Sequence, residues 1–197
     1  MLNPVSRELN LNNLALVFDV LQGIDAFIFF GTLLGYVREG NIIEYDDDID
    51  VYVNATDLNP LLTALEGSGF NVNVLPIRKK WYHRQKPPLI VQATRLQDGV
   101  ETYADFYLYD DVPAEYLLEK WNFKGAWKDP ATALHVPKDL VFPLKDAEMQ
   151  GIAIRVPAQP EALCEFLYGP SWSTPVRKSE GYVMEIVNHT PVFRPKS

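Results

Sequence analysis

The segment 44–53, EYDDDIDVYV, places four aspartates within five positions at the start of an apolar strand pattern. Successive side chains of a β-strand point to opposite faces of the sheet. Asp48 and Asp50 therefore share one face, whereas the aliphatic residues that alternate with them share the other face and can enter a core. The chain must place this strand in a sheet that buries one face and keeps carboxylates on the other.

Hydrophobic periodicity predicts a mixed order of helices and strands along the chain. Helices are predicted over residues 5–22, 31–38, 55–69, 113–121 and 160–169. Strands are predicted over residues 26–30, 48–53, 71–77, 89–96 and 101–109, a small hairpin over 147–156, and irregular or short-stranded backbone over 125–144. Asp98-Gly99 is a favoured hairpin turn. This order indicates an α+β fold with a mixed central sheet and flanking helices.

Composition restricts the classes of function. With 197 residues and 47% hydrophobic content, the chain can build one sizeable core, so we expect a single domain over 1–175 and a C-terminal extension over 176–197. No apolar run reaches 18 residues, which predicts no membrane span. The net charge of −8 argues against nonspecific nucleic-acid binding. A single cysteine, Cys164, fits a reducing compartment and a cytoplasmic location.

The paired carboxylates predict a metal site. Two carboxylates on one strand face can hold a divalent cation through the oxygen ligands that magnesium prefers. Asp105 is a lone acid in the predicted strand 101–109, and it joins the pair if that strand neighbours 48–53. By itself, Asp105 is more simply a hydrogen-bonded strand residue. For Asp46 and Asp47 a solvated turn before the strand is the simpler interpretation.

A phosphate site is predicted upstream of the acids. Gly31 and Thr32 follow an apolar strand pattern and open a helical one. A helix N-terminus presents free N–H groups and the positive end of the helix dipole to an anion. Gly31 would let the backbone approach a phosphate, and the Thr32 hydroxyl would add a hydrogen bond. A strand exit with a helix cap is the alternative explanation of the same two residues.

The segment from Gly31 to Asp50 resembles the LicD/fukutin family. The family pattern of Gly-Thr-Leu-Leu-Gly, an Arg, a Gly, an aromatic residue and Asp-Asp-Asp-Ile-Asp stands here as Gly31 to Gly35, Arg38, Gly40, Tyr45 and Asp46 to Asp50. The segment 141–172 is similar to the family's Phe-Pro-Leu segment, Gly-centred hairpin and helix ending in Tyr-Gly. Together the similar segments extend over most of residues 10–175, and the stretch 70–135 matches loosely.

The resemblance implies a nucleotidyltransferase-like fold and a Mg²⁺- or Mn²⁺-dependent transferase. Such an enzyme moves a phosphorylated alcohol (phosphocholine, ribitol phosphate or similar) from a CDP-linked donor to a hydroxyl of a glycan or glycolipid. On this hypothesis Asp48, Asp50 and Asp105 are the catalytic metal ligands, with Asp46 as a further candidate. Two metal ions would bind: Asp48 and Asp50 would bridge both, and Asp105 would hold the one nearest the acceptor while the other serves the donor. A glycolipid acceptor would bring a cytoplasmic protein to the membrane periphery.

Basic residues supply further candidates for binding the donor. Arg38 lies two helical turns after Gly31 and could reach the donor phosphates, neutralise an aspartate, or form a plain surface ion pair. The segment 78–86, RKKWYHRQK, is the one basic concentration in the sequence. Within it, Lys79, Lys80 and Arg84 are candidates for an anion clamp, and a solvated loop is the alternative.

Two other functions fit the same residues. A nucleotidyltransferase that uses a nucleoside triphosphate to modify a small molecule or protein would have the same metal site. A non-catalytic nucleotide-binding module that kept the fold is the second alternative. The presence of all the expected acids argues against the latter.

Overall fold

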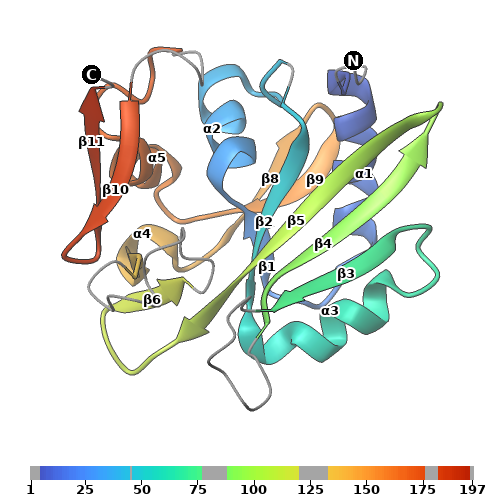
Figure 1. Cartoon of the computed structure of the whole chain (residues 1–197), viewed down its shortest axis with the longest axis horizontal. Coiled ribbons are helices and arrows are strands. Elements are labelled where there is room, and N and C mark those ends of the chain that lie inside the picture. The colour runs from blue at the N-terminus through green and yellow to red at the C-terminus, as the bar shows by residue number, and fades with distance from the viewer. Residues whose placement is uncertain (1–4, 45, 77–87, 120–132, 176–181, 196–197) are drawn as a thin grey trace.

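The computed structural model describes residues 5–44, 46–76, 88–119, 133–175 and 182–195 (Figure 1). The helices are α1 (Arg7–Val20), α2 (Phe30–Glu39), α3 (Leu58–Leu65), α4 (Lys138–Val141) and α5 (Pro160–Tyr168), with a 3-10 turn η1 (Ala55–Asp57) before α3. The strands are β1 (Ala26–Ile28), β2 (Asp48–Asn54), β3 (Asn71–Pro76), β4 (Pro88–Gln97), β5 (Val100–Asp111), β6 (Tyr116–Glu119), β7 (His135–Pro137), β8 (Lys145–Met149), β9 (Ile152–Val156), β10 (Tyr182–Val187) and β11 (Thr190–Pro195).

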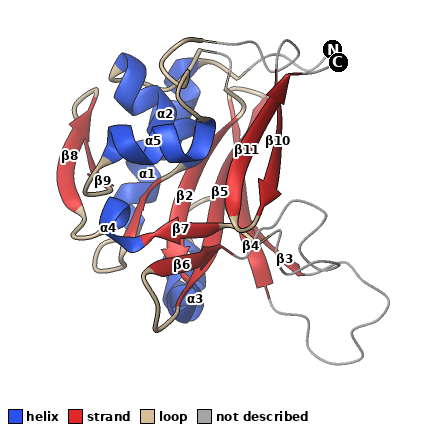
Figure 2. Cartoon of the chain, turned by 90° about the vertical axis from the view of Figure 1, so that its left-hand side faces the viewer, coloured by secondary structure: helices blue, strands red, loops and turns tan. Residues whose placement is uncertain are grey.

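The central sheet is mixed and has the order β1-β2-β5-β4-β3, with β6 and β7 extending from β5. Strands β2 and β5 are parallel, whereas β1 with β2, β5 with β4, and β4 with β3 are antiparallel. In Figure 2, helices α1, α2 and α5 lie to the left of β5 and β4, with β8 and β9 beyond them. The predicted α+β class with a mixed central sheet and flanking helices is confirmed.

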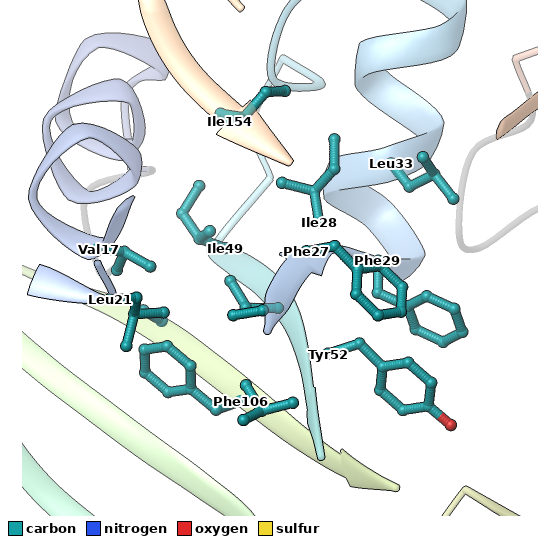
Figure 3. Close-up of a cluster of buried hydrophobic side chains, with 14 of the residues drawn as sticks. Val17, Leu21, Phe27, Ile28, Phe29, Leu33, Ile49, Tyr52, Phe106 and Ile154 are labelled. Carbon is teal, nitrogen blue, oxygen red and sulfur yellow. The ribbon is translucent and has the colours of Figure 1, made fainter. Parts of the chain in front are cut away.

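One face of β2 enters the hydrophobic core, as the alternation predicted. Ile49 is fully buried, and Val17 of α1 and Leu21, directly after α1, lie near Phe106 of β5 on the same side of the sheet (Figure 3). Burying an aliphatic side chain of this size contributes roughly 1.5–3 kcal/mol to folding. This packing fixes β2 and β5 relative to each other, and so fixes the opposite face that carries the acids.

Aromatic side chains pack against the far end of that opposite face. The Phe29 ring stacks on the Tyr52 ring with centroids 4.1 Å apart and planes 8° apart, and Phe27 meets Tyr52 edge-on at 5.5 Å. Tyr52 follows Asp50 by two positions and is fully buried. The β2 face is therefore polar at its start and closed by aromatic rings at its end.

One element prediction was wrong, and one strand ends earlier than predicted. The stretch 113–121 is predicted as a helix, but Tyr116–Glu119 forms strand β6, which pairs with the end of β5 and with β7. Leu117 and Glu119 of β6 are buried while the alternate residues are half-buried, so pairing with distant strands overrides local helix propensity. The strand predicted over 26–30 ends at Ile28, because Phe30 already belongs to α2.

Other elements agree with the sequence. The hairpin turn at Asp98-Gly99 joins β4 and β5, and both turn residues have positive φ, 49° and 78°. Cys164 is buried in α5, as a core residue, and burial raises the pKa of its thiol to about 12. Among the described helices, none is long and apolar enough to cross a membrane.

The described part of the C-terminal extension is a hairpin, β10–β11, that contacts the body of the protein. The His135 backbone N–H donates to the His189 carbonyl oxygen at 3.1 Å. The imidazole rings of these two residues stack with centroids 3.7 Å apart, and Tyr116 stacks on the other side of His135 at 3.8 Å. Helix α5 also packs against β11. The domain boundary at 175 stays a prediction.

Candidate active site

Strand pairing brings the predicted acids together. In the parallel pair β2–β5, Asp50 is the register partner of Asp105, and Asp48 is the partner of Tyr103. Register partners on neighbouring strands point to the same face, and the strands lie only about 4.8 Å apart. Asp50 and Asp105 are 5% and 9% exposed. The sequence predicted that Asp105 would join the pair if its strand lay next to 48–53, and the strand does lie there.

The residues before β2 add to this cluster. Asp46, Asp47 and Asp48 each offer a carboxylate oxygen within 4.8 Å of the others, an arrangement that could hold a metal ion. Asp46 Oδ2 and Asp50 Oδ2 both lie 3.0 Å from the position that a Cβ on Gly31 would take. Asp46 is half-buried and lies with the strand acids rather than in a solvated turn. Asp47 is exposed, as the turn interpretation expects.

Electrostatics in the cluster favour a cation. Burial raises the pKa of the Asp50 carboxyl well above its usual range, and the charges of Asp48 and Asp46 raise it further. Burial also raises the pKa of Asp105, and the charge of Asp47 adds to that shift. Like charges and desolvation both disfavour an ionised carboxylate. A bound divalent cation would relieve this repulsion.

Three hydrogen bonds connect the N-terminus of α2 to Asp50. The Gly31 N–H donates to Asp50 Oδ2 at 2.7 Å, the Asp50 N–H donates to Thr32 Oγ1 at 2.9 Å, and the Phe29 N–H donates to the Asp50 carbonyl at 3.0 Å. Thr32 is fully buried. Its hydroxyl therefore joins the helix to the strand of acids, and its predicted contact with a donor phosphate stays untested.

The helix entry is strained next to the acids. Phe30, the first residue of α2, has φ 36°, a left-handed value that is unusual for a bulky side chain. Its ring packs against Phe29 at 4.5 Å and Tyr107 at 4.8 Å, and these contacts hold it there. The next residue, Gly31, aims its N–H at Asp50. Such strain is typical of functional sites.

Two polar residues that contact the acidic segment were not predicted from the sequence. Asn10 of α1 is fully buried, and its Nδ2 donates to the Asp46 carbonyl oxygen at 2.8 Å. Gln92 of β4 donates from Nε2 to Asp105 Oδ1 at 3.0 Å. The available signal was a single polar residue inside an apolar helix or strand pattern. That signal is weak, because amphipathic elements tolerate single polar residues.

One predicted basic residue forms an ion pair with an acid of its own helix, and the others lie outside the described residues. The Arg38 guanidinium is 3.5 Å from Glu39 Oε1, and Arg7 binds Glu39 at 2.7 Å. Among the described contacts, Arg38 therefore forms an ion pair at the end of α2, which was one of its alternatives. Lys79, Lys80 and Arg84 lie outside the described residues, as does Tyr45 of the family pattern.

Comparison with known families identifies the chain. The family model for the LicD/FKTN/FKRP nucleotidyltransferase domain matches residues 23–159, which contain the acid cluster, Asp105 and the start of α2. The chain belongs to the LicD family. A comparison with curated proteins gives no match.

A solved structure supports the fold of this LicD domain. The crystal structure of the lincosamide antibiotic adenylyltransferase LnuA, lincomycin-bound, is similar with a TM-score of 0.50 and 14% sequence identity, over 85% of this chain and 89% of that chain. At this identity the likeness shows the fold alone, and it confirms the predicted nucleotidyltransferase-like class. Family and fold together support a phosphotransferase or nucleotidyltransferase-like role.

Thr32→Val tests how firmly the helix is fastened to the acids of the LicD domain. Valine fills a similar volume but leaves the buried Asp50 N–H without its acceptor. We expect a loss of about 1–3 kcal/mol in the free energy of unfolding, the cost of an unsatisfied buried donor. Urea denaturation measures this loss. Thr56→Val, at an exposed position in the turn before α3, is the control, and an equal loss in both variants would contradict the assignment.

Gly31→Ala tests the close approach of the acids to α2. The new Cβ would lie 3.0 Å from carboxylate oxygens of Asp46 and Asp50, which can turn away. We expect Mg²⁺ binding to weaken about 10-fold, as when ligand orientation is disturbed, with little loss of metal-free stability.

Gly35→Ala is the matched control for this substitution in the same helix. Its Cβ would lie 2.5 Å from the Asn41 carbonyl oxygen, a backbone atom, so the fold should lose stability with or without metal. Thermal melting with and without Mg²⁺ separates the two effects. Equal behaviour of the two alanine variants would contradict a specific role for Gly31.

Proposed function

We propose that this LicD-family protein transfers a phosphorylated alcohol from a CDP-linked donor to a hydroxyl of a glycan or glycolipid, with the aid of Mg²⁺ or Mn²⁺. The observation that carries the proposal is the register of β2 and β5. It sets Asp105 beside Asp50, with Asp48 two residues earlier and the N-terminus of α2 against the cluster. Acids that can hold a cation, next to a helix N-terminus, suit the phosphates of a nucleotide-linked donor.

The candidate ligands fit a hard divalent cation. All the candidate ligands are carboxylates, and Mg²⁺ and Mn²⁺ prefer oxygen ligands. Asp48, Asp50 and Asp105 would hold two metal ions, one for the donor and one for the acceptor. Asp46 would be a further ligand, since its Oδ2 flanks the same point as Asp50 Oδ2. When bound, the metal supplies charge neutralisation at the phosphoryl group and lowers the pKa of the acceptor hydroxyl.

The chain's own residues bind the donor and take the acceptor's proton. The helix N-terminus would receive the donor phosphates through backbone N–H groups other than that of Gly31, which already donates to Asp50 Oδ2, because the Thr32 side chain is fully buried. Asp105 is the candidate for receiving the proton of the acceptor hydroxyl, since it would hold the metal nearest the acceptor. Lys79, Lys80 and Arg84 remain candidates for an anion clamp from sequence alone, and Arg38 for a donor contact.

A nucleotidyltransferase that uses a nucleoside triphosphate is the second candidate function. The similarity to an antibiotic adenylyltransferase favours it through the fold. The metal site would serve both reactions. The difference lies in the bond that breaks: a CDP-alcohol releases CMP, whereas a triphosphate releases pyrophosphate.

A donor screen tests the proposal. The full chain is incubated with Mg²⁺, a panel of glycan acceptors and, separately, CDP-choline, CDP-ribitol, CDP-glycerol and each nucleoside triphosphate. Release of CMP with a mass shift of the acceptor by one alcohol phosphate supports the proposed function. Pyrophosphate release with nucleotidylation favours the second candidate. Tight nucleotide binding with no turnover in any combination would instead support a non-catalytic module.

A further inference from the structure

We infer that Gln92 is a positioning residue that holds the Asp105 carboxylate in the orientation required for metal binding. This inference rests on the proposed function, which assigns Asp105 to the metal. Gln92 lies directly opposite Asp105 in the antiparallel pair β4–β5. Its Nε2 donates to Asp105 Oδ1 at 3.0 Å. The direction of this hydrogen bond is fixed by chemistry, because an ionised carboxylate can only accept.

The backbone around Gln92 is held on both sides. Strand β4 lies between β3 and β5 (Figure 1), and Gln92 is the register partner of Asn73 on β3 and of Asp105 on β5. A residue in an interior strand has both of its backbone groups in sheet ladders. The Gln92 side chain is therefore attached to a fixed backbone. Its amide hydrogen bond can in turn fix the orientation of the Asp105 carboxylate.

Gln92 interrupts a run of buried apolar residues along β4, which makes the choice of glutamine informative. Ile90, Val91 and Ala93 are all buried, with Ile90 on the same face as Gln92 and the other two on the opposite face. A partly buried amide in such a strand costs free energy unless it is hydrogen-bonded, and an aliphatic residue would stabilise the strand without this condition. Asp105 satisfies the Gln92 amide, and Gln92 satisfies one oxygen of Asp105.

A neutral hydrogen-bond donor is a suitable partner for a carboxylate that binds a metal. The Gln92 amide fixes Oδ1 and leaves Oδ2 available, and it adds no positive charge that would compete with a cation. Lysine or arginine at the same place would neutralise the carboxylate. Partners of this kind orient metal ligands in many proteins. The other buried acid of the cluster is held in the same way, since Asp50 Oδ2 accepts from the Gly31 backbone N–H at 2.7 Å.

Gln92→Met tests this role by removing the amide donor at nearly constant side-chain length. Mn²⁺ alone is titrated into the full chain, without donor or acceptor, and the dissociation constant is measured by calorimetry. We expect the constant to rise about 10-fold or more relative to the wild type. If the methionine variant does not fold, Gln92→Thr replaces it, because threonine favours strands and is too short to reach Asp105.

Gln97→Met is the matched control. Gln97 is also on β4 and also donates from Nε2, to Asn13 Oδ1 at 2.8 Å and to the Leu9 carbonyl at 3.1 Å, in a polar network that joins α1 to the sheet. Its substitution should lower thermal stability and leave Mn²⁺ affinity within about twofold of the wild type, because its amide contacts none of the acids. This control separates loss of a buried amide from loss of ligand orientation.

The combination with Asp105→Asn decides the mechanism. If Gln92 acts through Asp105, Gln92→Met should weaken Mn²⁺ binding no further once Asp105 is asparagine. Wild-type affinity in Gln92→Met, or an equal loss in both backgrounds, would overturn the inference while the proposed metal site stands. Wild-type affinity in Asp105→Asn would overturn the inference together with the proposed role of Asp105.

Discussion

Asp50→Asn is expected to reduce transfer at least about 100-fold, since losing an outer partner of a metal ligand already costs 10- to 100-fold. Asp50 lies at the centre of the candidate site: it is buried, beside Asp105 in register, and bonded to the first turn of α2. The substitution removes a charged oxygen from the ligand set. Single-turnover transfer from the donor found in the screen measures the effect.

The same substitution should leave the metal-free protein at least as stable as the wild type. Asparagine Oδ1 can still accept the hydrogen bond from the Gly31 N–H. Removing one charge from a cluster in which Asp48 and Asp46 raise the pKa of Asp50 also relieves repulsion. Melting in a chelator measures this stability. Added Mg²⁺ should raise the melting temperature of the wild type and not that of the Asp48→Asn/Asp50→Asn double variant.

Asp98→Asn is the control for the change in net charge. Asp98 is exposed at the hairpin turn with φ 49°, a conformation that asparagine also adopts readily. It should retain wild-type transfer and the wild-type response to Mg²⁺. Near-normal transfer by Asp50→Asn in Mg²⁺ would show that Asp50 is not a metal ligand.

The local features of the site could be predicted because they depend on short-range geometry. The period of two along a strand places Asp48 and Asp50 on one face whatever the rest of the chain does. The Asp98-Gly99 turn likewise requires only its own two residues and their flanking strands. The break between a strand and a helix at Gly31 was also visible, within one or two residues.

The remaining features depend on contacts between distant parts of the chain. The pairing of β2 with β5 joins residues that are far apart in sequence, so the sequence could only make the role of Asp105 conditional on it. Strand β6 was missed because its pairing with β5 outweighs a helical local pattern. Thr32 illustrates the same limit: its hydroxyl accepts from the Asp50 N–H of a distant strand, a contact that the sequence could not show, and its predicted phosphate contact stays a prediction.

Asp105→Asn is expected to leave donor binding nearly intact and to reduce transfer by orders of magnitude. Asparagine can still accept the hydrogen bond from Gln92, so β5 should keep its place beside β2. Asp48 and Asp50 would still hold a metal ion against the donor phosphates, and the N-terminus of α2 remains in place. Loss of the ligand nearest the acceptor, and of a base for its proton, affects the transition state more than the ground state.

Calorimetry of donor binding beside single-turnover transfer separates the roles of the acids. For Asp105→Asn the two measurements should diverge, whereas for Asp50→Asn both should fall, because Asp50 lies against the helix N-terminus. Equal loss of donor binding and transfer in Asp105→Asn would assign Asp105 to the donor metal. If neither changed, Asp105 would be a structural strand residue, and Asp46 would be the next ligand to test, because its Oδ2 already flanks the same point as Asp50 Oδ2.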